Sequence, residues 1–509
     1  MRDTYGKIFP LDQLVSTIKE EKKNGARHIL CHGVFDVMHS GHIFYFKAAK
    51  KYGSKLIVSI TPDCHVNKGP NRPTLNQNLR LQNVAEIESV DYVILNQWPT
   101  AVELIHKLKP HAYAKGYDYQ NAKDDITGNI EKEKRAIEKV GGKLVFTKEP
   151  SFSSSSLINE LFPPYSESAQ SFLKEFKKKY TLSDVEKYLD KLKQLKVLII
   201  GEAIIDRYTY CIPLAKSTKD SIISTKLVDE ENFLGGSLAI ANHVSNFCGK
   251  TSLITNLGCE DDIGGIVSEK MNKNVYLHKI VSNDRPTIIK QRFVDRYRLF
   301  KMFEIQEMDD RPIPLVLQKK IPLLIRDLES SHDLVIVADY GHGFITSEIV
   351  HQLTQLDKFL CVNAQTNSAN LGFNLITKYP RANFACIDEP EIRFATHDKF
   401  SNINELVKIV YQKSDFESIM VSLGAEGTSF FKKDLQMEHT PVFSNNVVDR
   451  TGAGDALFSL TAPLAFLNCP PKMLGLLANC AGALAVKTLC NQQPLSQLQV
   501  RKFLRALLA

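Results

Sequence analysis

The sequence predicts an α/β protein whose mostly parallel sheets are covered by helices on both faces. Short apolar runs rich in β-branched residues recur along the 509 residues and alternate with helical patterns. In two places, near residues 28–45 and 447–458, an apolar strand leads through a glycine-containing turn directly into a helix. Such a junction collects unpaired backbone N–H groups at the positive end of a helix dipole. Both junctions therefore predict binding of phosphate groups.

Composition is typical of a globular protein, with 43% hydrophobic and 24% charged residues. The length suits two large domains or about three of ordinary size. The sequence shows no apolar run of about 18 residues and no signal peptide, and its ten cysteines lack CxxC spacing. We therefore expect a cytoplasmic protein with reduced thiols and no membrane contact. The net charge of +7 is spread along the chain, and we expect no nucleic-acid partner.

The first junction carries two histidines. Residues 28–31 form the strand, Gly33 opens the turn, and His39 and His42 lie where the helix begins. Both imidazoles can reach one phosphate, and donor imidazoles stabilise the charge that develops on phosphorus during transfer. Histidine pairs also cap helices or bind metal, but no further His or Cys cluster follows at zinc-ligand spacing.

The first junction closely resembles the signature of cytidylyltransferase-like nucleotidyltransferases, and the resemblance covers about residues 25–162. The matching residues are Gly33, Phe35, Asp36, His39, Gly41 and His42. The resemblance implies a Rossmann-like domain whose paired histidines bind a nucleoside triphosphate and stabilise the transition state. Other positions that match nucleotide-binding residues of the family are Lys68, Arg72, Arg80, Lys115, Asp118, Lys148, Ser154 and Ser155. Lys148 replaces an arginine of relatives such as glycerol-phosphate cytidylyltransferase.

A domain of this kind joins a sugar 1-phosphate to a nucleotide with loss of pyrophosphate. The reaction needs positioning and charge neutralisation, usually with Mg²⁺, and the donor is ATP or CTP because the motif binds the triphosphate and not the base. A catalytically inactive copy is one alternative, against which the intact histidine pair argues. Flavin or coenzyme-A nucleotidyl transfer is another, but it leaves the rest of the chain unexplained.

Two adjacent prolines, Pro163 and Pro164, mark a boundary because they stop a helix. We predict a nucleotidyltransferase domain at residues 1–162, a helical linker at 163–195 and a second domain at 196–509. Within the linker, residues 183–186 match a capping box at the start of an amphipathic helix. The linker lysines at 174 and 177–179 are interpreted as a solvated helix face.

The second junction places Asp455 at the edge of an anion hole. Val447 and Val448 end a strand, residues 452–454 form a Gly-Ala-Gly turn, and an apolar helix follows. A carboxylate in this position can take a proton from a hydroxyl that attacks a phosphoryl group. A glycine turn capped by an aspartate is the simpler interpretation, and the upstream segments decide between the two.

Buried strands recur upstream of this junction, with helical segments between them. They lie at residues 197–200, 334–338, 360–362, 384–387 and 419–422. Residues 281–304 carry alternating Ile, Phe and Arg, which predicts strands of a small β lid. In this order the segments resemble the ribokinase-like (PfkB) sugar kinases across about residues 195–509.

The kinase resemblance implies Mg²⁺ with ATP, a homodimer, and Asp455 as the catalytic base. The implied sugar-binding residues are Asp206, Gly235, Gly236, Asn242, Arg292 and Asp455. The implied nucleotide-binding residues are Ser422, Gly424, Gly427, Thr451, Gly452, Ala453, Gly454 and Asn479. Asp388 and Glu391 occupy the metal/phosphate motif and imply an indirect metal contact.

Within that family the nearest match is the kinase half of the bifunctional heptose 7-phosphate kinase and heptose 1-phosphate nucleotidyltransferases, which also carry both domains. The order of the domains is reversed here. His342 stands where those kinases carry lysine, and residues 362–365 replace an Asp-Pro-Lys segment. The cations that can replace the missing charge are Lys290, Arg292, Arg296 and Arg298.

Two functional hypotheses follow. In the first, a bifunctional enzyme phosphorylates a sugar at C1 and then makes a nucleotide-activated sugar of the ADP-heptose type from a sugar phosphate and a nucleoside triphosphate. In the second, only the nucleotidyltransferase is active, and the kinase-like half is a regulatory module that binds sugar or nucleotide.

Overall fold

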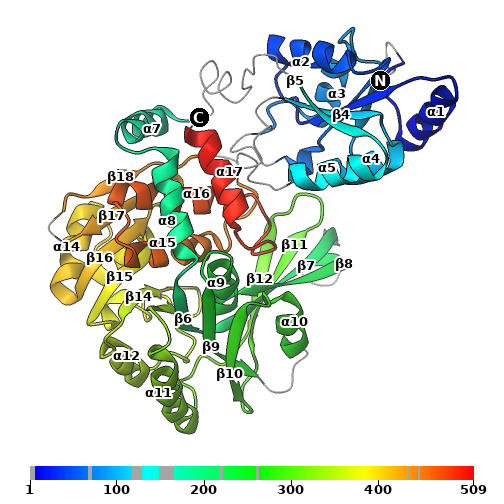
Figure 1. Cartoon of the computed structure of the whole chain (residues 1–509). Helices are drawn as coiled ribbons and strands as arrows, with labels where there is room; N and C mark the ends of the chain where they lie inside the picture. The colour runs from blue at the N-terminus through cyan, green and yellow to red at the C-terminus, as the bar shows by residue number, and fades with distance from the viewer. Residues whose placement is uncertain are drawn as a thin grey trace. The chain divides into compact units, whose positions relative to one another are not determined.

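The computed structural model describes residues 6–66, 72–116, 129–147, 165–216, 222–258, 263–433, 435–444 and 447–508. The chain divides into two compact units. The first comprises Met1–Ser166 together with Arg501–Ala509, and the second comprises Glu167–Val500. Each unit contains its own parallel sheet and its own hydrophobic core (Figure 1).

The first unit is built on a five-stranded sheet in the order β3-β2-β1-β4-β5. Its strands are β1 (His28–Gly33), β2 (Lys55–Ile60), β3 (Tyr92–Leu95), β4 (Ala112–Gly116) and β5 (Lys143–Thr147). All neighbouring strands are parallel. The strand order reverses direction beside β1, and ligands of such sheets bind beyond the carboxyl ends of the strands at this point. The turn after Gly33 lies there.

Two hydrophobic layers cover this sheet because alternate residues of each strand face opposite sides. Ile29 and Cys31 pack with Phe46 and Val84 on one side, whereas Leu30 packs with the other layer. The helices are α1 (Leu11–Lys23), α2 (Ser40–Lys50), α3 (Gln77–Ala85), α4 (Val102–Leu108) and α5 (Asn129–Lys139). α2 and α3 contribute to the first layer, and α1, α4 and α5 to the second.

Helices α7 (Glu167–Lys179) and α8 (Leu182–Leu192) belong to the second unit. The predicted capping box at residues 183–186 is wrong by two residues. The Thr181 hydroxyl accepts from the Asp184 N–H at 3.3 Å, and the Asp184 carboxylate accepts from the Thr181 N–H at 3.0 Å. The sequence contains two overlapping pairs that fit a capping box, one at residues 181–184 and one at residues 183–186. The helix begins early enough to use the first pair.

The main sheet of the second unit has nine strands in the order β10-β9-β6-β13-β14-β15-β16-β17-β18. Their bounds are β6 (Lys196–Gly201), β9 (Lys250–Gly258), β10 (Val275–Ser282), β13 (Leu334–Asp339), β14 (Phe359–Ala364), β15 (Arg381–Asp388), β16 (Asp415–Ser422), β17 (Thr428–Lys432) and β18 (Glu438–Thr440). Among the described strands of this sheet, the pairs β16–β17 and β17–β18 are antiparallel and the others are parallel. All five stretches predicted as buried strands lie in it, so the predicted α/β class is confirmed.

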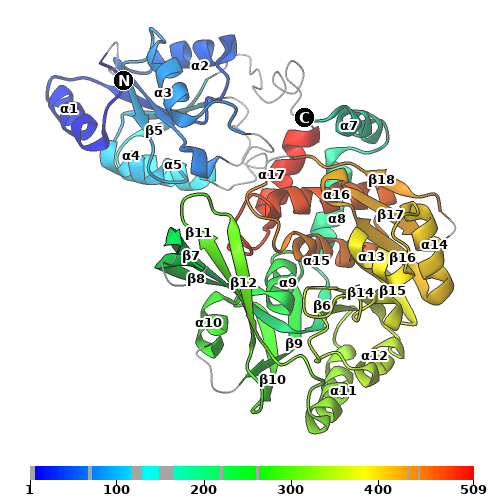
Figure 2. The same ribbon diagram turned by 180° about the vertical axis from the view of Figure 1, so that it is seen from behind.

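Helices cover both faces of the main sheet. They are α9 (Gly236–Ser245), α10 (Ile263–Lys270), α11 (Leu315–Glu329), α12 (Ser347–Thr354), α13 (Glu389–Thr396), α14 (Ile403–Lys413), α15 (Ala453–Phe466) and α16 (Pro471–Ala485). The last helix, α17 (Gln497–Leu508), belongs to the first unit from Arg501 onward. α9, α15 and α16 pack together and against strands of the sheet. α13 and α14 lie beside β15 and β16, as the view from behind shows (Figure 2).

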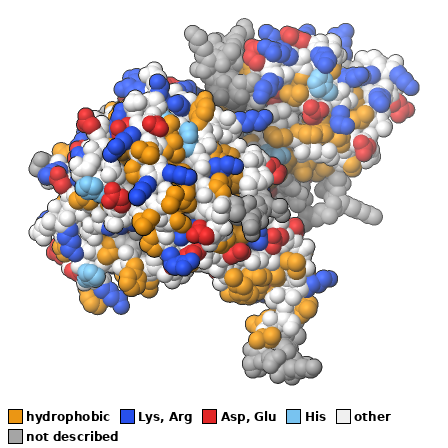
Figure 3. Space-filling view, turned by 90° about the horizontal axis from the view of Figure 1, so that it is seen from below, with side chains coloured by type: hydrophobic (Ala, Val, Ile, Leu, Met, Phe, Trp, Pro, Cys, Tyr) orange, Lys and Arg blue, Asp and Glu red, His pale blue; other side chains and the backbone are white. Residues whose placement is uncertain are grey.

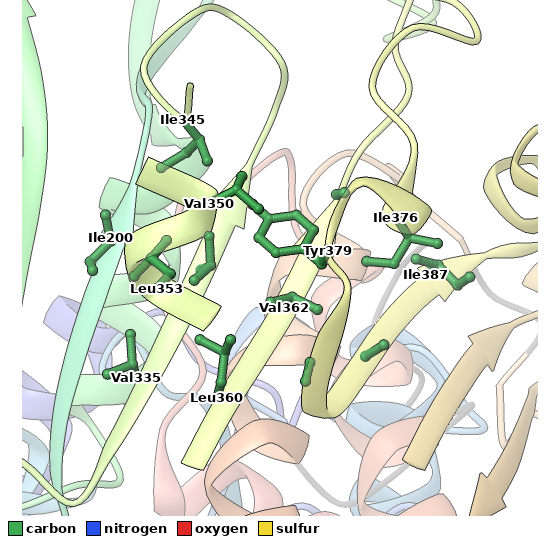
Figure 4. Packing of buried hydrophobic residues seen from close by; sticks show 14 of the residues in the cluster. Ile200, Val335, Ile345, Val350, Leu353, Leu360, Val362, Ile376, Tyr379 and Ile387 are labelled. Atoms are coloured by element: carbon green, nitrogen blue, oxygen red, sulfur yellow. The ribbon is translucent and has the colours of Figure 1, made fainter. Parts of the chain in front are cut away.

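A large core cluster joins α11 to α14 to the main sheet. Figure 4 shows how Ile200, Val335 and Leu360 from three parallel strands meet Val350 and Leu353 of α12. Burying one side chain of this size stabilises the fold by about 1.5–3 kcal/mol. The layer fixes the carboxyl ends of β13 to β16, where the site described below lies.

A separate four-stranded sheet forms the lid, in the order β12-β11-β7-β8. Its strands are β7 (Ala203–Lys216), β8 (Ile223–Gly235), β11 (Ile288–Asp295) and β12 (Lys301–Glu307). β11 and the first half of β12 fall within the predicted lid segment, 281–304, but the length of β7 and β8 was not predicted. β7 follows β6 almost at once, and β8 runs directly into α9. The lid strands are therefore continuous with the elements that line the site.

None of the helices in the described ranges is long and apolar enough to cross a membrane. On the face drawn in Figure 3, Lys and Arg side chains are interspersed with Asp and Glu. This distribution agrees with a net charge that is spread along the sequence.

Candidate functional site

In the first unit, the structure brings His39 and His42 together at the beginning of α2. His39 is the N-cap residue and His42 lies in the first turn. The ring centroids are 3.9 Å apart and the ring planes differ by 31°. Burial lowers the pKa of His39, so the neutral imidazole is favoured at neutral pH. The paired rings at a helix N-terminus suit binding of an anion such as a phosphate.

The turn before the histidines depends on Gly33 and Phe35. Phe35 adopts a left-handed backbone conformation with φ of 49°, and a Cβ atom on Gly33 would lie 3.0 Å from its ring. The Phe35 ring is buried, 5.0 Å from Phe46 and edge-on to His42 at 5.5 Å. Gly33 and Phe35 thus shape the turn and support the histidine pair. This structural role differs from the direct nucleotide binding predicted for them.

Asp36 ties this turn to the segment after β2. Its buried carboxylate accepts hydrogen bonds from the N–H groups of Thr74 and Leu75, both at 2.9 Å. Arg72 forms an ion pair with the same carboxylate at 3.4 Å. Asp36 therefore positions Arg72 at the edge of the turn.

Arg80 was predicted as a nucleotide ligand, but its side chain contacts other groups of the protein. Its fully buried guanidinium donates to the carbonyl oxygens of Leu75, Val34 and Thr61 at 3.0, 2.5 and 2.8 Å. It also donates to Asp63 at 2.5 Å. A buried guanidinium needs such acceptors, and here they all come from the protein. Arg80 therefore locks the turn after β1 to the segment after β2.

Lys115, another predicted nucleotide ligand, forms an ion pair with the buried Glu133 of α5 at 3.1 Å. His32 was not predicted as a site residue. It contacts the Ser59 and Thr61 hydroxyls, and burial lowers its pKa to about 3. The predicted ligands Lys68, Asp118, Lys148, Ser154 and Ser155 lie outside the described residues.

In the second unit, a cavity of about 310 Å³ lies where β13 to β16 end and the lid sheet begins. It brings together many of the predicted site residues from distant parts of the sequence. Its lining includes Asp206, Gly236, Arg292, Asp388, Glu391, Ser422, Thr451, Gly452, Gly454 and Asp455. Its further polar lining residues are Lys290, which was predicted as a replacement for missing charge, and Tyr340, Asn363, Gln365 and Arg450, which were not predicted as ligands.

The anion hole of this cavity is the N-terminus of α15. Gly452 has φ of 81°, and a Cβ atom there would lie 2.0 Å from the Asn491 side-chain oxygen, so only glycine fits. No side chain caps the helix, and Gly454 faces open space. The first N–H groups of α15 are thus presented to the cavity with the positive end of the helix dipole. Ala453 is the first residue of this helix.

Asp455 lies in the first turn of α15 and lines the cavity. Burial raises the pKa of Asp455 to about 7, and the negative charge of Asp206 adds to this. The Tyr340 hydroxyl donates to Asp455 Oδ1 at 2.7 Å, which together with the charge of Lys290 opposes the rise. A carboxyl group that titrates near neutral pH is suited to general-base catalysis.

Asp206 and Gly236 line the cavity on the side of the lid, whereas Gly235 lies outside its lining. Asp206 pairs with Arg292, which also binds Glu304 at 2.8 Å. A Cβ atom on Gly235 would lie 2.3 Å from the Asp206 carboxylate, and one on Gly236 would lie 2.6 Å from a backbone oxygen. Both glycines are therefore required for the chain to pass behind Asp206.

Lys290 remains without a hydrogen bond or ion pair among the described residues, although only 6% of it is exposed. It pairs in register with Asp206 across β7 and β11. Burial lowers the pKa of Lys290. A desolvated ammonium at the cavity wall is an effective partner for an anionic ligand. Arg296 instead stacks on Tyr210, with 5.4 Å between its guanidinium carbon and the ring centroid.

Asp388 and Glu391 form a capping box at the start of α13. Each carboxylate accepts from the other residue's N–H at 2.8 Å, and Glu391 also accepts from the Thr366 N–H at 3.1 Å. Burial raises the pKa of Glu391 to about 8, and the neighbouring Asp388 adds to the rise. No three His, Cys, Asp or Glu side chains gather at a metal-binding distance within the described ranges. The two carboxyl groups fit a water-mediated contact with Mg²⁺, which keeps several of its waters.

Asn242 and Asn479 do not line the cavity, so their predicted ligand roles are not supported by their placement. The Asn242 side chain bonds the Lys270 carbonyl at 3.0 Å and the Asn272 N–H at 2.8 Å. Asn479 donates to the Thr428 hydroxyl at 2.8 Å. Both buried amides connect elements of the fold, which satisfies their hydrogen-bonding groups.

Gly424 and Gly427 also lie outside the lining, in the turn that follows Ser422. Their φ values are 56° and 104°. A Cβ atom on Gly427 would lie 2.1 Å from the Thr440 carbonyl oxygen. The two glycines therefore shape the backbone beside the cavity.

Asp449 connects the anion hole to the lid and was not predicted as a site residue. It accepts from Lys301 of β12 at 2.7 Å, from the Tyr208 hydroxyl of β7 at 2.6 Å and from the Thr451 N–H at 3.0 Å. Burial alone would raise the pKa of Asp449, but these donors hold it below its usual value. The contact couples the lid strands to the loop that precedes Gly452.

The buried environment of Arg80 generates a stability prediction. Arg80→Met leaves Val34, Thr61, Leu75 and Asp63 without their donor, so the free energy of unfolding should fall by about 3 kcal/mol. Fluorescence of Trp98, the single tryptophan of the sequence, reports denaturant unfolding of the first unit. The exposed Arg135→Met is the matched control and should change stability by less than about 0.5 kcal/mol. If Arg80→Met unfolds like the wild type but no longer binds the triphosphate, Arg80 is a nucleotide ligand as first predicted.

Comparison with known families agrees with this geometry. Residues 194–496 match the model of the pfkB family carbohydrate kinases, and residues 30–161 match the cytidylyltransferase-like family. Phosphofructokinase-2 from Escherichia coli in complex with substrates and products superposes with a TM-score of 0.51, covering 62% of this chain and 99% of that one. At 10% sequence identity this likeness shows the fold alone.

Relatives of known name match the cytidylyltransferase-like part. Bifunctional protein HldE of Methylobacillus flagellatus is 34% identical over 158 residues, which are 30% of this chain and 31% of that protein. Bifunctional protein HldE of Helicobacter pylori is 32% identical over 163 residues, covering 32% of each chain. The chain thus spans about a third of the length of the curated relatives it matches.

The order of the two parts is reversed relative to HldE. The kinase match extends over more than half of the sequence and includes the glycine-lined turn, Asp455 and the lid sheet. The chain belongs to the pfkB family of carbohydrate kinases and carries a cytidylyltransferase-like domain ahead of its kinase domain.

Proposed function

We propose that the chain is a bifunctional enzyme that phosphorylates a sugar and then converts a sugar 1-phosphate into a nucleotide-activated sugar of the ADP-heptose type. The observation that carries the proposal is Asp455 beside an uncapped, glycine-lined helix N-terminus, in a cavity that also contains Asp206 and Lys290. The histidine pair of the first unit and the similarity to HldE support the second activity.

In the kinase step, Asp455 takes the proton of the sugar hydroxyl while that oxygen attacks the terminal phosphorus of ATP, and the bond from this phosphorus to the leaving ADP breaks. The N–H groups at the start of α15 stabilise the negative charge of the transferred group. Asp206 binds sugar hydroxyls, and Lys290 pairs with an anionic group of the reactants. Asp388 and Glu391 would hold Mg²⁺ through water, and the cation would neutralise phosphate charge.

In the nucleotidyltransferase step, a phosphate oxygen of the sugar 1-phosphate attacks the α-phosphorus of ATP or CTP. The bond to the leaving pyrophosphate breaks in the same displacement, so no covalent enzyme intermediate is needed. His39 and His42 stabilise the charge on the phosphorus centre, and the N-terminus of α2 adds its dipole. Positioning and charge neutralisation supply the catalysis.

The assignment of the remaining ligands, the domain division 1–162, 163–195 and 196–509, and a cytoplasmic location belong to the same proposal. All cysteines of the described ranges are free thiols, which is typical of a reducing compartment. A homodimer is proposed because the lid sheet exposes large apolar side chains, a feature of interaction surfaces. These are Ile223 and Leu227 of β8 and Phe303 and Ile305 of β12.

A second candidate function is a regulatory kinase-like half that binds sugar or nucleotide without catalysis. The observation that favours it is the loss of charge at the cavity wall. Asn363 and Gln365 line the cavity where heptose kinases of the resembling group carry an Asp-Pro-Lys segment. His342 is buried, and its burial lowers its pKa to about 4, so it supplies no fixed charge.

Asp455→Asn separates the two candidates. If Asp455 is the base, sugar-dependent ATP consumption should fall at least about 100-fold, because amide nitrogen and oxygen accept no proton at neutral pH. Pyrophosphate release from a sugar 1-phosphate should be unchanged. The assay is a panel of sugars and sugar phosphates with ATP and CTP, with products identified by mass spectrometry. Wild-type ATP consumption by the variant would favour the regulatory function.

His39→Ala tests the other site. Pyrophosphate release should fall about 100-fold, because one imidazole that stabilises the charge on the phosphate oxygens is lost. Kinase turnover should remain, since the two sites are built from different units. His106→Ala, on α4, is the control and should leave both rates unchanged. Loss of both activities in a folded His39→Ala protein would contradict independent sites.

A further inference from the structure

Tyr340 lies in the loop after β13 and lines the cavity, although only 2% of it is exposed. Its hydroxyl donates to Asp455 Oδ1 at 2.7 Å. Asp455 Oδ2 accepts no hydrogen bond from the described residues. One oxygen of the carboxylate is thus held by the protein, and the other is left for a ligand.

The backbone of Tyr340 is fixed from both sides. Its N–H donates to the fully buried Glu202 at 3.0 Å. Its carbonyl oxygen accepts from the Asn367 and Asn370 side chains at 2.8 and 2.7 Å. Gly341 follows with φ of 70°, and a Cβ atom there would lie 2.2 Å from the Asn370 amide nitrogen. These contacts leave the phenol little freedom to leave Asp455.

A second layer of polar contacts holds this loop from below. The buried Asp339 accepts from the Tyr379 hydroxyl at 2.6 Å and from the Asn374 side chain at 3.1 Å, and it pairs with Lys378. Glu202 also accepts from the His342 N–H at 3.2 Å. Burying two carboxyl groups is costly unless their acceptors are filled. Both carboxyl groups are buried next to the loop that contains Tyr340.

We propose that Tyr340 is a positioning residue for Asp455, one that fixes the orientation of the carboxylate and stabilises its ionised form for proton transfer. This inference rests on the proposed kinase reaction. In this arrangement the Tyr340 hydroxyl donates a hydrogen bond to Asp455 Oδ1, and the sugar hydroxyl contacts Oδ2. Tyr340 acts through Asp455 and does not itself accept the proton.

The charges around Asp455 show why such a donor is needed. Burial and the charge of Asp206 disfavour the ionised form of Asp455. Arg292 is already paired with Asp206 and Glu304, and His342 is neutral. Glu202, behind Tyr340, has a pKa raised to about 7 by burial and by Asp339. Lys290 and the Tyr340 hydroxyl are therefore the groups that favour ionised Asp455.

The test is Tyr340→Phe, with Tyr379→Phe as the matched control. Both changes remove one hydroxyl from a buried phenol that donates to a carboxylate, but only Tyr340 contacts Asp455. Loss of the donor should move the acid limb of the kcat profile upward by about one pH unit. The rate at about pH 6 should therefore fall about tenfold and recover at about pH 9, whereas Tyr379→Phe should keep the wild-type midpoint.

A direct titration makes the inference independent of turnover. The ¹³C carboxyl signal of Asp455, assigned by its absence in Asp455→Asn, should titrate at higher pH in Tyr340→Phe. A 3-fluorotyrosine at position 340 keeps the shape of the side chain and is a stronger donor, so it should move the midpoint downward even if the phenylalanine variant does not fold. An unmoved Asp455 signal in the fluorinated protein, or equal shifts in both phenylalanine variants, would overturn the inference. Absent kinase turnover with the predicted shifts would refute only the proposed reaction.

Discussion

A partly buried carboxylate at the N-terminus of a helix is the constraint around which the second unit is arranged. In the proposed reaction Asp455 must lie close to the transferred phosphoryl group, yet a charge in that cavity loses much of its hydration. The structure offsets the loss with Tyr340, Lys290 and the dipole of α15. The same elements make the site attractive to anions, so one arrangement serves both the base and the phosphate.

The lid sheet takes part in this arrangement because charged residues on its strands contact the cavity from above. Arg292 lies between Asp206 and Glu304, and Lys301 reaches Asp449 at the entrance of the anion hole. Separate pieces of sequence, near residues 206, 292, 301 and 449, are thus linked by ion pairs. The pair of Arg292 with Asp206 is largely buried, so salt screens it less than the pair of Asp449 with the exposed Lys301.

Several predictions from sequence were confirmed because they depend on local pattern. Five buried strands, the α/β class and the start of a helix after the glycine turn at Gly452 all follow from apolar periodicity and glycine placement. The strand predicted to end at Val447 and Val448 is wrong, because both residues are exposed and form no strand. The predictions for Arg80, Asn242 and Asn479 were of another kind, since they assumed that a polar residue at a matched position faces a ligand. In the structure these side chains satisfy buried backbone groups, and the sequence contains no signal that separates the two uses.

The sequence by itself determined where glycine turns precede helices, which are the places proposed to bind phosphate. A glycine turn before a helix exposes backbone N–H groups whatever surrounds it, because glycine alone tolerates the positive φ of Gly452. Only the tertiary structure decided what accompanies that turn. Tyr340 is 115 positions from Asp455, and Lys301 is 148 positions from Asp449. Contacts across such separations depend on how the sheet and the lid pack. No local sequence pattern predicts this packing.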